Sequence, residues 1–229
     1  MVQSSLACGM GSHLEVELKW ALDADGHARL LAALTTELGP PQVLEQHNRF
    51  LDSTDLRLRR AGLNLRLRRE NDRLLMTCKR KIDDGDSGSD SGSGLHRHDE
   101  WEAWLDPGLW NATAASCTKY LSLPEPHLVA LAGAELSDLG GFANKRAEFH
   151  LRRAGDDDLL CLDRTDFNGW RTDYELEIET SDPTGAARYW GGRLADWNIP
   201  WQPEARTKFA RFLALAAEQR ATDQRGVSR

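Results

Sequence analysis

The sequence predicts a protein of the α+β class, because segments with the two-residue period of a β-strand are joined by segments with the spacing of amphipathic helices. Helices are expected to begin near Asp25, Thr184 and Ala205. Most of the strand-like segments alternate charged with apolar residues. The predicted strands lie near residues 14–20, 43–52, 63–70, 73–81, 96–105, 140–152, 158–165 and 172–180.

The N-terminal strand is the clearest example of this alternation. In Glu15-Val-Glu-Leu-Lys19, the three charged side chains point to one face, and Val16 and Leu18 point to the other. A half-buried strand with its charged face in water has the same pattern. What favours a different interpretation is that the pattern recurs along the chain with both signs of charge.

The recurring pairs are basic in two strands and acidic in two others. They are Arg66 with Arg68, Lys79 with Lys81, Glu100 with Glu102, and Glu175 with Glu177. If the strands close into a barrel, these faces line a common interior, where charges are costly unless they are paired or bind a ligand. The ligand that suits both signs is a polyanion with divalent cations, because Arg and Lys bind phosphate oxygens and carboxylates bind Mg²⁺ or Mn²⁺.

Taken in order, these segments resemble the motifs of the CYTH superfamily, the triphosphate tunnel metalloenzymes. The matching segments are Glu15-x-Glu17-x-Lys19, Asn48–Thr54, Leu65-Arg-Leu-Arg68, Thr77-x-Lys79, Glu100-x-Glu102, Asn144-Lys-Arg146 with Leu162-Asp163, Glu175-x-Glu177 and Arg206-Thr-Lys208-Phe. The resemblance extends over roughly residues 13–215. It implies a closed antiparallel eight-stranded β-barrel with flanking helices, whose interior is a triphosphate tunnel.

The resemblance also implies roles for individual residues. Catalytic roles fall to Glu17, Lys79 and Glu177. The residues expected to bind the substrate are Lys19, Arg66, Arg68, Lys79, Lys81, Arg146 and Lys208. The residues expected to bind Mg²⁺ or Mn²⁺ are Glu15, Glu17, Glu100, Glu102, Glu175 and Glu177, with Asp163 as a further supporting acid. Strand parity leaves open whether Lys145 or Arg146 faces the interior, because adjacent residues cannot both do so.

Members of the superfamily include inorganic triphosphatases, thiamine triphosphatases and class IV adenylate cyclases. Cyclase-like members carry a Gly-Leu-Gly motif before the last acidic pair, and this chain lacks it between Asp163 and Glu175. We therefore expect hydrolysis of inorganic triphosphate to pyrophosphate and phosphate. The alternatives are a thiamine or nucleoside triphosphatase, a class IV-type adenylate cyclase and a non-catalytic polyphosphate-binding module.

A length of 229 residues suits one single-domain barrel or two small domains, and the resemblance favours the single barrel. We expect a single domain over residues 13–220, flexible tails at 1–12 and 221–229, and a flexible acidic Gly/Ser loop at 83–94. The net charge of −7 disfavours nucleic acid as a partner. Residues 49–81 nevertheless contain 11 basic and 4 acidic residues, a local excess of seven that indicates an anion site.

The cysteines and the hydropathy pattern indicate in which cellular compartment the protein is expected. Cys8, Cys78, Cys117 and Cys161 are too scattered for a zinc site or a disulfide scaffold. No apolar stretch approaches the roughly 18 residues of a membrane span, and the N-terminal segment lacks the features of a secretory signal. We expect a cytoplasmic protein without a membrane partner, and its oligomeric state stays open.

Overall fold

The computed structural model describes residues 10–82, 94–111, 135–153 and 155–227. The strands in this part of the chain are β1 Met10–Leu22, β2 Gln42–Ser53, β3 Leu63–Glu70, β4 Arg73–Lys81, β5 Leu95–Leu105, β6 Leu136–Arg153, β7 Asp156–Asp166, β8 Thr172–Glu179 and β9 Gln202–Pro203. The helices are α1 Ala24–Leu38, α2 Arg57–Arg60, α5 Pro183–Asp196 and α6 Lys208–Val227, with a 3₁₀-helix, η2, at Pro107–Asn111.

The strands form one sheet in the order β5-β4-β3-β2-β6-β7-β8-β1, and pairing between β5 and β1 closes it. The short strand β9 adds to β1, where Gln202 is opposite Ala21. The result is a closed eight-stranded antiparallel β-barrel with a few flanking helices, which confirms the predicted fold class. All eight strands predicted from the sequence are present.

The chain divides into two compact units, each with a hydrophobic core of its own. Unit 1 consists of the described residues within Met1–Glu15, Gln46–Asp83 and Arg97–Gly140. Unit 2 consists of those within Val16–Glu45, Asp84–His96 and Gly141–Arg229. The boundary between the two units lies within β1, between Glu15 and Val16.

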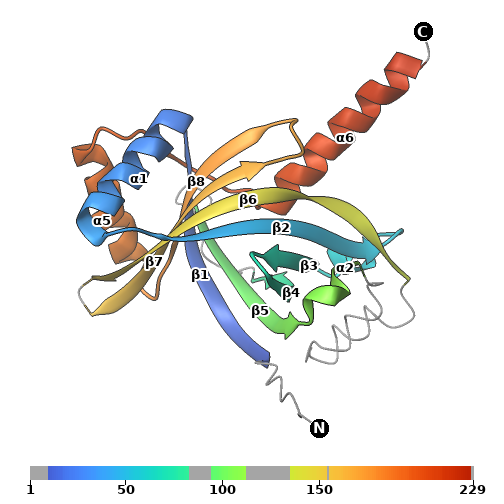
Figure 1. Cartoon of the computed structure of the whole chain (residues 1–229), viewed down its shortest axis with the longest axis horizontal. Coiled ribbons are helices and arrows are strands. Elements are labelled where there is room, and N and C mark those ends of the chain that lie inside the picture. The colour runs from blue at the N-terminus through green and yellow to red at the C-terminus, as the bar shows by residue number, and fades with distance from the viewer. Residues whose placement is uncertain (1–9, 83–93, 112–134, 154, 228–229) are drawn as a thin grey trace. The chain divides into compact units, whose positions relative to one another are not determined.

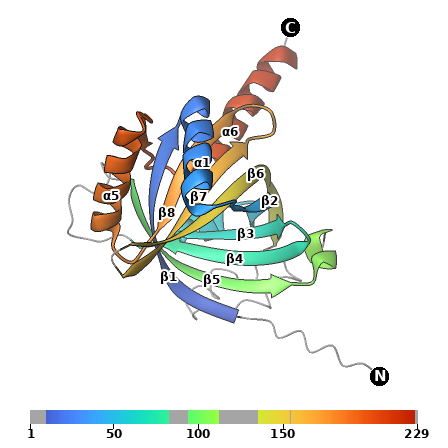
Figure 2. The same cartoon turned by 60° about the vertical axis from the view of Figure 1, so that its left-hand side comes forward.

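The core of unit 2 lies between strands and two helices. Figures 1 and 2 show α1 and α5 side by side over one face of the sheet. Leu30 of α1 and Trp190 of α5 are buried there with Leu176 and Ile178, the apolar residues of β8. The side chains that alternate with these on β8 therefore point to the opposite face.

In unit 1, strands β3, β4 and β5 run side by side (Figure 2). Their apolar face buries Leu65, Leu67, Met76, Cys78, Trp101 and Ala103 in the second core. Arg66, Lys79 and Glu100 alternate with these residues, so they project from the other face. In both units the alternation of the sequence thus separates an apolar face from a charged one.

Both ends of the domain differ from the sequence prediction. Strand β1 begins at Met10, so residues 10–12 belong to a strand and not to a tail. The sequence did not indicate this, because charged and apolar residues alternate only from Leu14 onward. Helix α6 begins at Lys208, after Thr207, whose hydroxyl accepts the N–H of Ala210 at 3.1 Å. It continues to Val227 because no Pro interrupts residues 221–227. The Gly/Ser loop expected at 83–94 lies outside the described residues except for Gly94.

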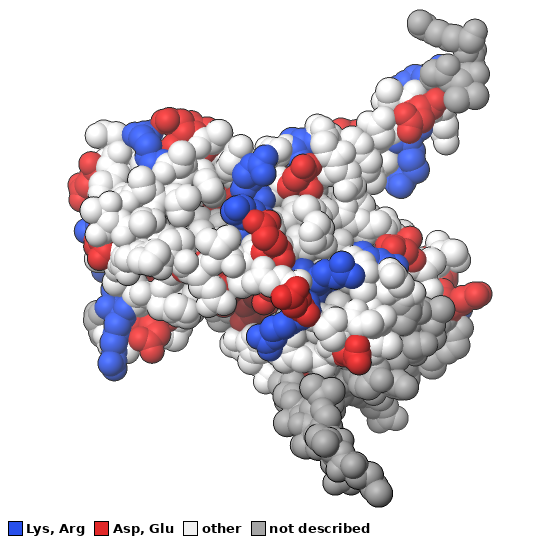
Figure 3. Space-filling view, in the orientation of Figure 1, with Lys and Arg blue, Asp and Glu red and all other residues white. Residues whose placement is uncertain are grey.

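Acidic and basic side chains are interspersed along the outer part of α6 in the face drawn in Figure 3. Among the residues of this part of α6, Glu218, Arg220, Asp223 and Arg225 are exposed. This part of the helix presents no surface of a single sign. Among the described residues, no helix has both the length and the apolar character needed to cross a membrane.

We predict that Asp158→Ala lowers the free energy of unfolding by about 3 kcal/mol. Asp158 is 1% exposed, and it accepts hydrogen bonds from Arg153, Thr180 and the indole of Trp190. Its removal leaves buried donors without this acceptor. Urea unfolding followed by tryptophan fluorescence measures the change. The control is Asp157→Ala, at a side chain that is 86% exposed, and an equal loss in both variants would contradict the assignment.

Candidate active site

The charged face of unit 2 carries a buried group of ionised side chains, which we call the unit 2 ion cluster. It consists of Glu17, Lys19, Arg146, Asp163, Glu175, Glu177 and Lys208. Strand register assembles it, because Lys19 is opposite Glu177, and Asp163 is opposite both Arg146 and Glu175. Lys208 enters from the first turn of α6. Residues far apart in the sequence thus meet on one face of the sheet.

Glu177 occupies the centre of this cluster. Its carboxylate accepts hydrogen bonds from Lys19 at 2.5 Å, from Lys208 at 2.6 Å and from Arg146. Burial by itself would raise the pKa of Glu177, but the three cations outweigh it and hold the pKa well below its usual range. Glu177 is therefore a buried, ionised carboxylate.

Arg146 and Asp163 form a bidentate pair beside Glu177. The guanidinium donates from Nε at 2.9 Å and from Nη2 at 2.7 Å to the two oxygens of Asp163. Asn144 also donates to Asp163, at 2.9 Å. Burial opposes the charge on both partners, yet Arg146 and Lys208 keep the pKa of Asp163 low, and Asp163 keeps the pKa of Arg146 high. A bidentate pair of this kind fixes the orientation of the guanidinium.

Lys208 connects three carboxylates. Its Nζ lies 2.9 Å from Asp163, 2.7 Å from Glu175 and 2.6 Å from Glu177. Burial would lower the pKa of Lys208, but Asp163, Glu175 and Glu177 together raise it, so the ammonium keeps its charge. Arg211, one helical turn further along α6, donates to the other oxygen of Glu175 at 2.7 Å.

Unit 1 carries a second two-signed group on its charged face, which we call the unit 1 ion cluster. Lys79 lies 2.6 Å from Glu15 and 3.1 Å from Glu100, its partner across the β4–β5 pair. Arg66 lies 3.9 Å from Glu100 and donates to the hydroxyl of Thr77 at 3.3 Å. The group therefore has pairs of both signs, as in unit 2.

Glu102 and Arg68 extend the unit 1 ion cluster. Glu102 accepts from the hydroxyl of Thr77 at 3.4 Å. Burial and the adjacent Glu100 raise its pKa above the usual value, although Arg66 opposes this. Arg68 donates to the side chain of Asn48 at 3.0 Å and lies 4.0 Å from Glu70. These contacts hold Arg68 on the same face of β3 as Arg66.

The structure decides the choice between Lys145 and Arg146. Arg146 lies in the unit 2 ion cluster, whereas Lys145 points to the other side of β6 and pairs with Glu45 at the surface, at 3.0 Å. Lys81 shares its strand face with Lys79 but is exposed near the end of β4. Its part in substrate binding stays a prediction, with less support than that of Lys79.

Arg211, Asn144 and Thr165 belong to the hydrogen-bond network of the site, and sequence reasoning did not find them. Thr165 donates to Asn144, which in turn supports Asp163. The available signal for Arg211 was its position three residues after Lys208, which places both side chains on one face of a helix. Asn144 could have been recognised because it lies two residues before Arg146, so that both side chains point to the same face of the strand.

The residue types present suit a hard divalent cation. In unit 1, the carboxylates of Glu15 and Glu100 both contact Lys79, and Nδ1 of His98 lies 3.5 Å from the Glu15 carboxylate. Carboxylate oxygens are the ligands that Mg²⁺ and Mn²⁺ prefer. The donor set therefore fits a metal ion of this class.

Residues 13–200 match the family model of the CYTH domain, and this range is more than half of the chain. The chain therefore belongs to the CYTH domain family. This agrees with the closed barrel and with the resemblance of its motifs.

Individual relatives agree with this membership. YjbK of Bacillus subtilis (strain 168), a candidate triphosphatase by name, is 24% identical over 203 residues, which are 89% of this chain and 96% of YjbK. The structure of HpAC1 from Hippeastrum, a candidate adenylyl cyclase described as having a dominant triphosphatase activity, is 27% identical with a TM-score of 0.74. That likeness covers 87% of this chain and 95% of HpAC1. A candidate adenylate cyclase from Bacillus halodurans shares the fold, with 20% identity, a TM-score of 0.60 and coverage of 88% of this chain and 98% of its own.

We predict that Glu177→Gln weakens the dependence of stability on pH. Because the pKa of Glu177 is lower in the folded protein than in the unfolded chain, the carboxylate stabilises the fold above its unfolded pKa. That stability is lost as the pH falls through the acidic range. The slope of unfolding free energy against pH below about pH 5 should decrease by up to about 1.4 kcal/mol per pH unit.

Urea unfolding in EDTA, at pH values from about 3 to 7, measures this slope. The control is Glu218→Gln, at an exposed carboxylate of α6, which should leave the slope unchanged. An unchanged slope in Glu177→Gln would show that this carboxylate is not stabilised by Lys19, Lys208 and Arg146.

Proposed function

We propose that the protein hydrolyses inorganic triphosphate to pyrophosphate and phosphate in a metal-dependent reaction. The observation that carries the proposal is the buried carboxylate of Glu177, which Lys19, Lys208 and Arg146 share. Such a centre is costly to bury and is seldom justified by stability alone. A ligand that carries charges of both signs would account for this centre, because it could pair with the cations and with the carboxylates.

The balance of charge in the unit 2 ion cluster supports a ligand of this kind. The four carboxylates of Glu17, Asp163, Glu175 and Glu177 face the three cations of Lys19, Arg146 and Lys208. A bare polyanion would draw these cations away and leave the carboxylates buried and unpaired. A polyphosphate accompanied by divalent metal exchanges both kinds of pair at once, because its oxygens take the cations and its metal takes the carboxylates.

In this proposal the basic residues bind phosphate and the carboxylates hold the metal. Lys19, Arg146 and Lys208 bind phosphate oxygens and neutralise the charge that develops on the leaving pyrophosphate. Lys79, Arg66 and Arg68 in unit 1 have the same chemistry. Glu15, Glu17, Glu100, Glu102, Glu175 and Glu177 would hold the metal. A bound Mg²⁺ or Mn²⁺ supplies charge neutralisation and an activated water.

Two observations favour hydrolysis over cyclisation. The chain lacks the Gly-Leu-Gly motif before Glu175, and the similar structure of HpAC1 is described as having a dominant triphosphatase activity. Adenylate cyclase activity is the second candidate, because HpAC1 is also a candidate adenylyl cyclase by name. Both activities need the same triphosphate-binding residues, so a direct substrate comparison is required.

We predict that phosphate is released from tripolyphosphate faster than from ATP or thiamine triphosphate. The reason is that the ion clusters offer partners for phosphate and metal. Malachite-green detection with Mg²⁺ or Mn²⁺ measures the rates, EDTA should abolish them, and an immunoassay detects cyclic AMP. Conversion of ATP to cyclic AMP without any release of phosphate from tripolyphosphate would reject the proposal.

We predict that Arg146→Ala lowers kcat/KM for tripolyphosphate by about 100-fold, because a charge-assisted contact with the reacting phosphates is lost. Lys145→Ala is a matched control, since Lys145 is the adjacent residue of β6 and lies at the surface with Glu45. It should keep kcat/KM within about twofold of the wild type. Equal losses in the two variants would contradict the placement of Arg146 in the active site.

A further inference from the structure

Arg211 is a buried guanidinium that lies between the unit 2 ion cluster and a pocket at the start of α6. We infer that Arg211 is a positioning residue for the active site: it holds Glu175 in place so that Lys208 remains available to the phosphates. The inference rests on the proposed triphosphatase function. It concerns a residue that touches neither the proposed substrate nor the proposed metal.

The two carboxylate oxygens of Glu175 have different cationic partners. Oε1 accepts from Nη2 of Arg211 at 2.7 Å, and Oε2 lies 2.7 Å from Nζ of Lys208. The side chain of Glu175 is fully buried and that of Arg211 is 2% exposed. Glu175 therefore joins Arg211 to Lys208 in a region with little solvent screening.

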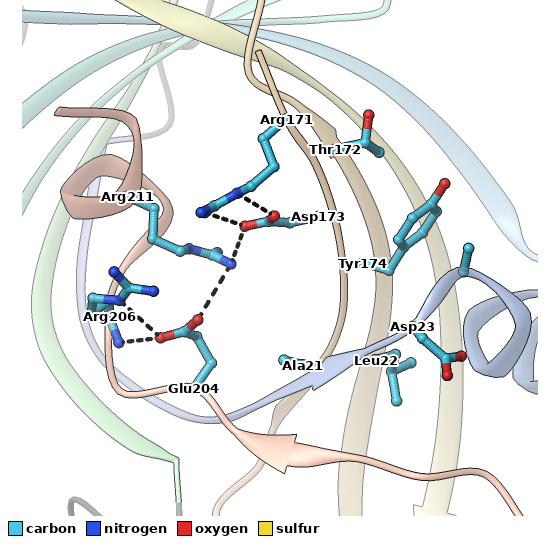
Figure 4. A pocket seen from close by; sticks show the side chains of 11 residues that line it. Ala21, Leu22, Asp23, Arg171, Thr172, Asp173, Tyr174, Glu204, Arg206 and Arg211 are labelled. Carbon is cyan, nitrogen blue, oxygen red and sulfur yellow. Dashed lines mark hydrogen bonds and ion pairs between the residues drawn. The ribbon is translucent and has the colours of Figure 1, made fainter. Parts of the chain in front are cut away.

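Arg211 is also anchored on the side away from Glu175. Its Nη1 donates to Asp173 at 2.8 Å and lies 3.6 Å from Glu204. Asp173 in turn pairs with Arg171 at 2.7 Å. Figure 4 shows these charged side chains along one side of the pocket, with Tyr174 and Leu22 on the other. The guanidinium is thus fixed by three acids, and Glu175 is fixed by the guanidinium.

Lys208 already forms ion pairs with Asp163, Glu175 and Glu177. Arg211 supplies part of the positive charge that Glu175 needs. Without Arg211, Lys208 becomes the main counter-ion of Glu175, and phosphate oxygens must compete for it. Loss of Arg211 should therefore weaken substrate binding and raise KM.

A purely structural role would have a different signature. It would reduce the fraction of folded enzyme, and so the apparent kcat, and leave KM unchanged. Arg153 is a matched control, because it is another mostly buried arginine of unit 2, paired with Asp158 at 2.9 Å and with Asp182 at 3.2 Å. It does not belong to the unit 2 ion cluster.

The pocket makes a chemical rescue possible. Its volume is about 430 Å³, and Arg211 forms part of its lining. Truncation of Arg211 to alanine adds the space of the side chain to this pocket, so that a guanidinium ion from solution can reach Glu175 and Asp173. Guanidinium has the planar donor geometry that carboxylates bind in a bidentate manner, and sodium does not.

The experiment compares the wild type, Arg211→Ala and Arg153→Ala in tripolyphosphate hydrolysis, with millimolar guanidinium chloride or an equal concentration of NaCl. We expect Arg211→Ala to raise KM about tenfold, and guanidinium, but not NaCl, to reverse most of this rise. Arg153→Ala should keep the wild-type KM, with or without guanidinium. Thermal unfolding of each variant measures the folded fraction.

Arg211→Lys is a second variant, in case alanine prevents folding. It keeps the charge but not the two-pronged donor, so its KM should also rise. A wild-type KM in either folded variant, or a rise that guanidinium leaves unchanged in Arg211→Ala, would overturn the role of Arg211 alone. Failure of the wild type to hydrolyse tripolyphosphate with Mg²⁺ or Mn²⁺ would instead overturn the proposed function, and the role of Arg211 with it.

Discussion

The pairing of buried carboxylates with buried cations is the constraint on which unit 2 depends. Each of Asp163, Glu175 and Glu177 contacts at least two basic groups, and Lys208 contacts all three acids. Ionised groups at this depth cannot be left without partners. The register of β6, β7 and β8, and the start of α6 at Lys208, must therefore agree, because an error of one residue in a strand would turn its charged side chains into the apolar core.

The apolar face of unit 2 stabilises the fold, whereas its charged face carries the groups that can bind a ligand. Buried ion pairs recover little more than their desolvation cost, whereas burial of Leu176, Ile178, Trp190 and their neighbours removes much apolar surface from water. The apolar face of β8 thus holds α1 and α5 in place. Its charged face carries groups that can exchange partners with a ligand, and one alternating strand serves both purposes.

Strand parity explains how much of the fold and the site could be predicted. Alternation identified the strands and grouped Glu15 with Glu17, and Glu175 with Glu177. It could not choose between Lys145 and Arg146, because the choice depends on the register of β6 against β7, which is a tertiary property. Arg211 was missed because the predicted helix placed it one turn after Lys208 but could not show that it contacts Glu175, a residue of another element. The contact of Asn144 with Asp163 depended on the same register.

Helix α6 connects the charged and the apolar parts of unit 2. Its first turn supplies Lys208 and Arg211, and the adjacent Phe212 packs near Phe142 and Trp170, with ring centroids 6.1 and 6.3 Å apart. The position of Lys208 is therefore fixed by apolar contacts as well as by the acids that surround it. Because coupling between binding and docking is reciprocal, any ligand that engages Lys208 also changes the free energy with which α6 is held. The start of α6 therefore links the apolar packing of Phe212 to the position of Lys208 in the unit 2 ion cluster.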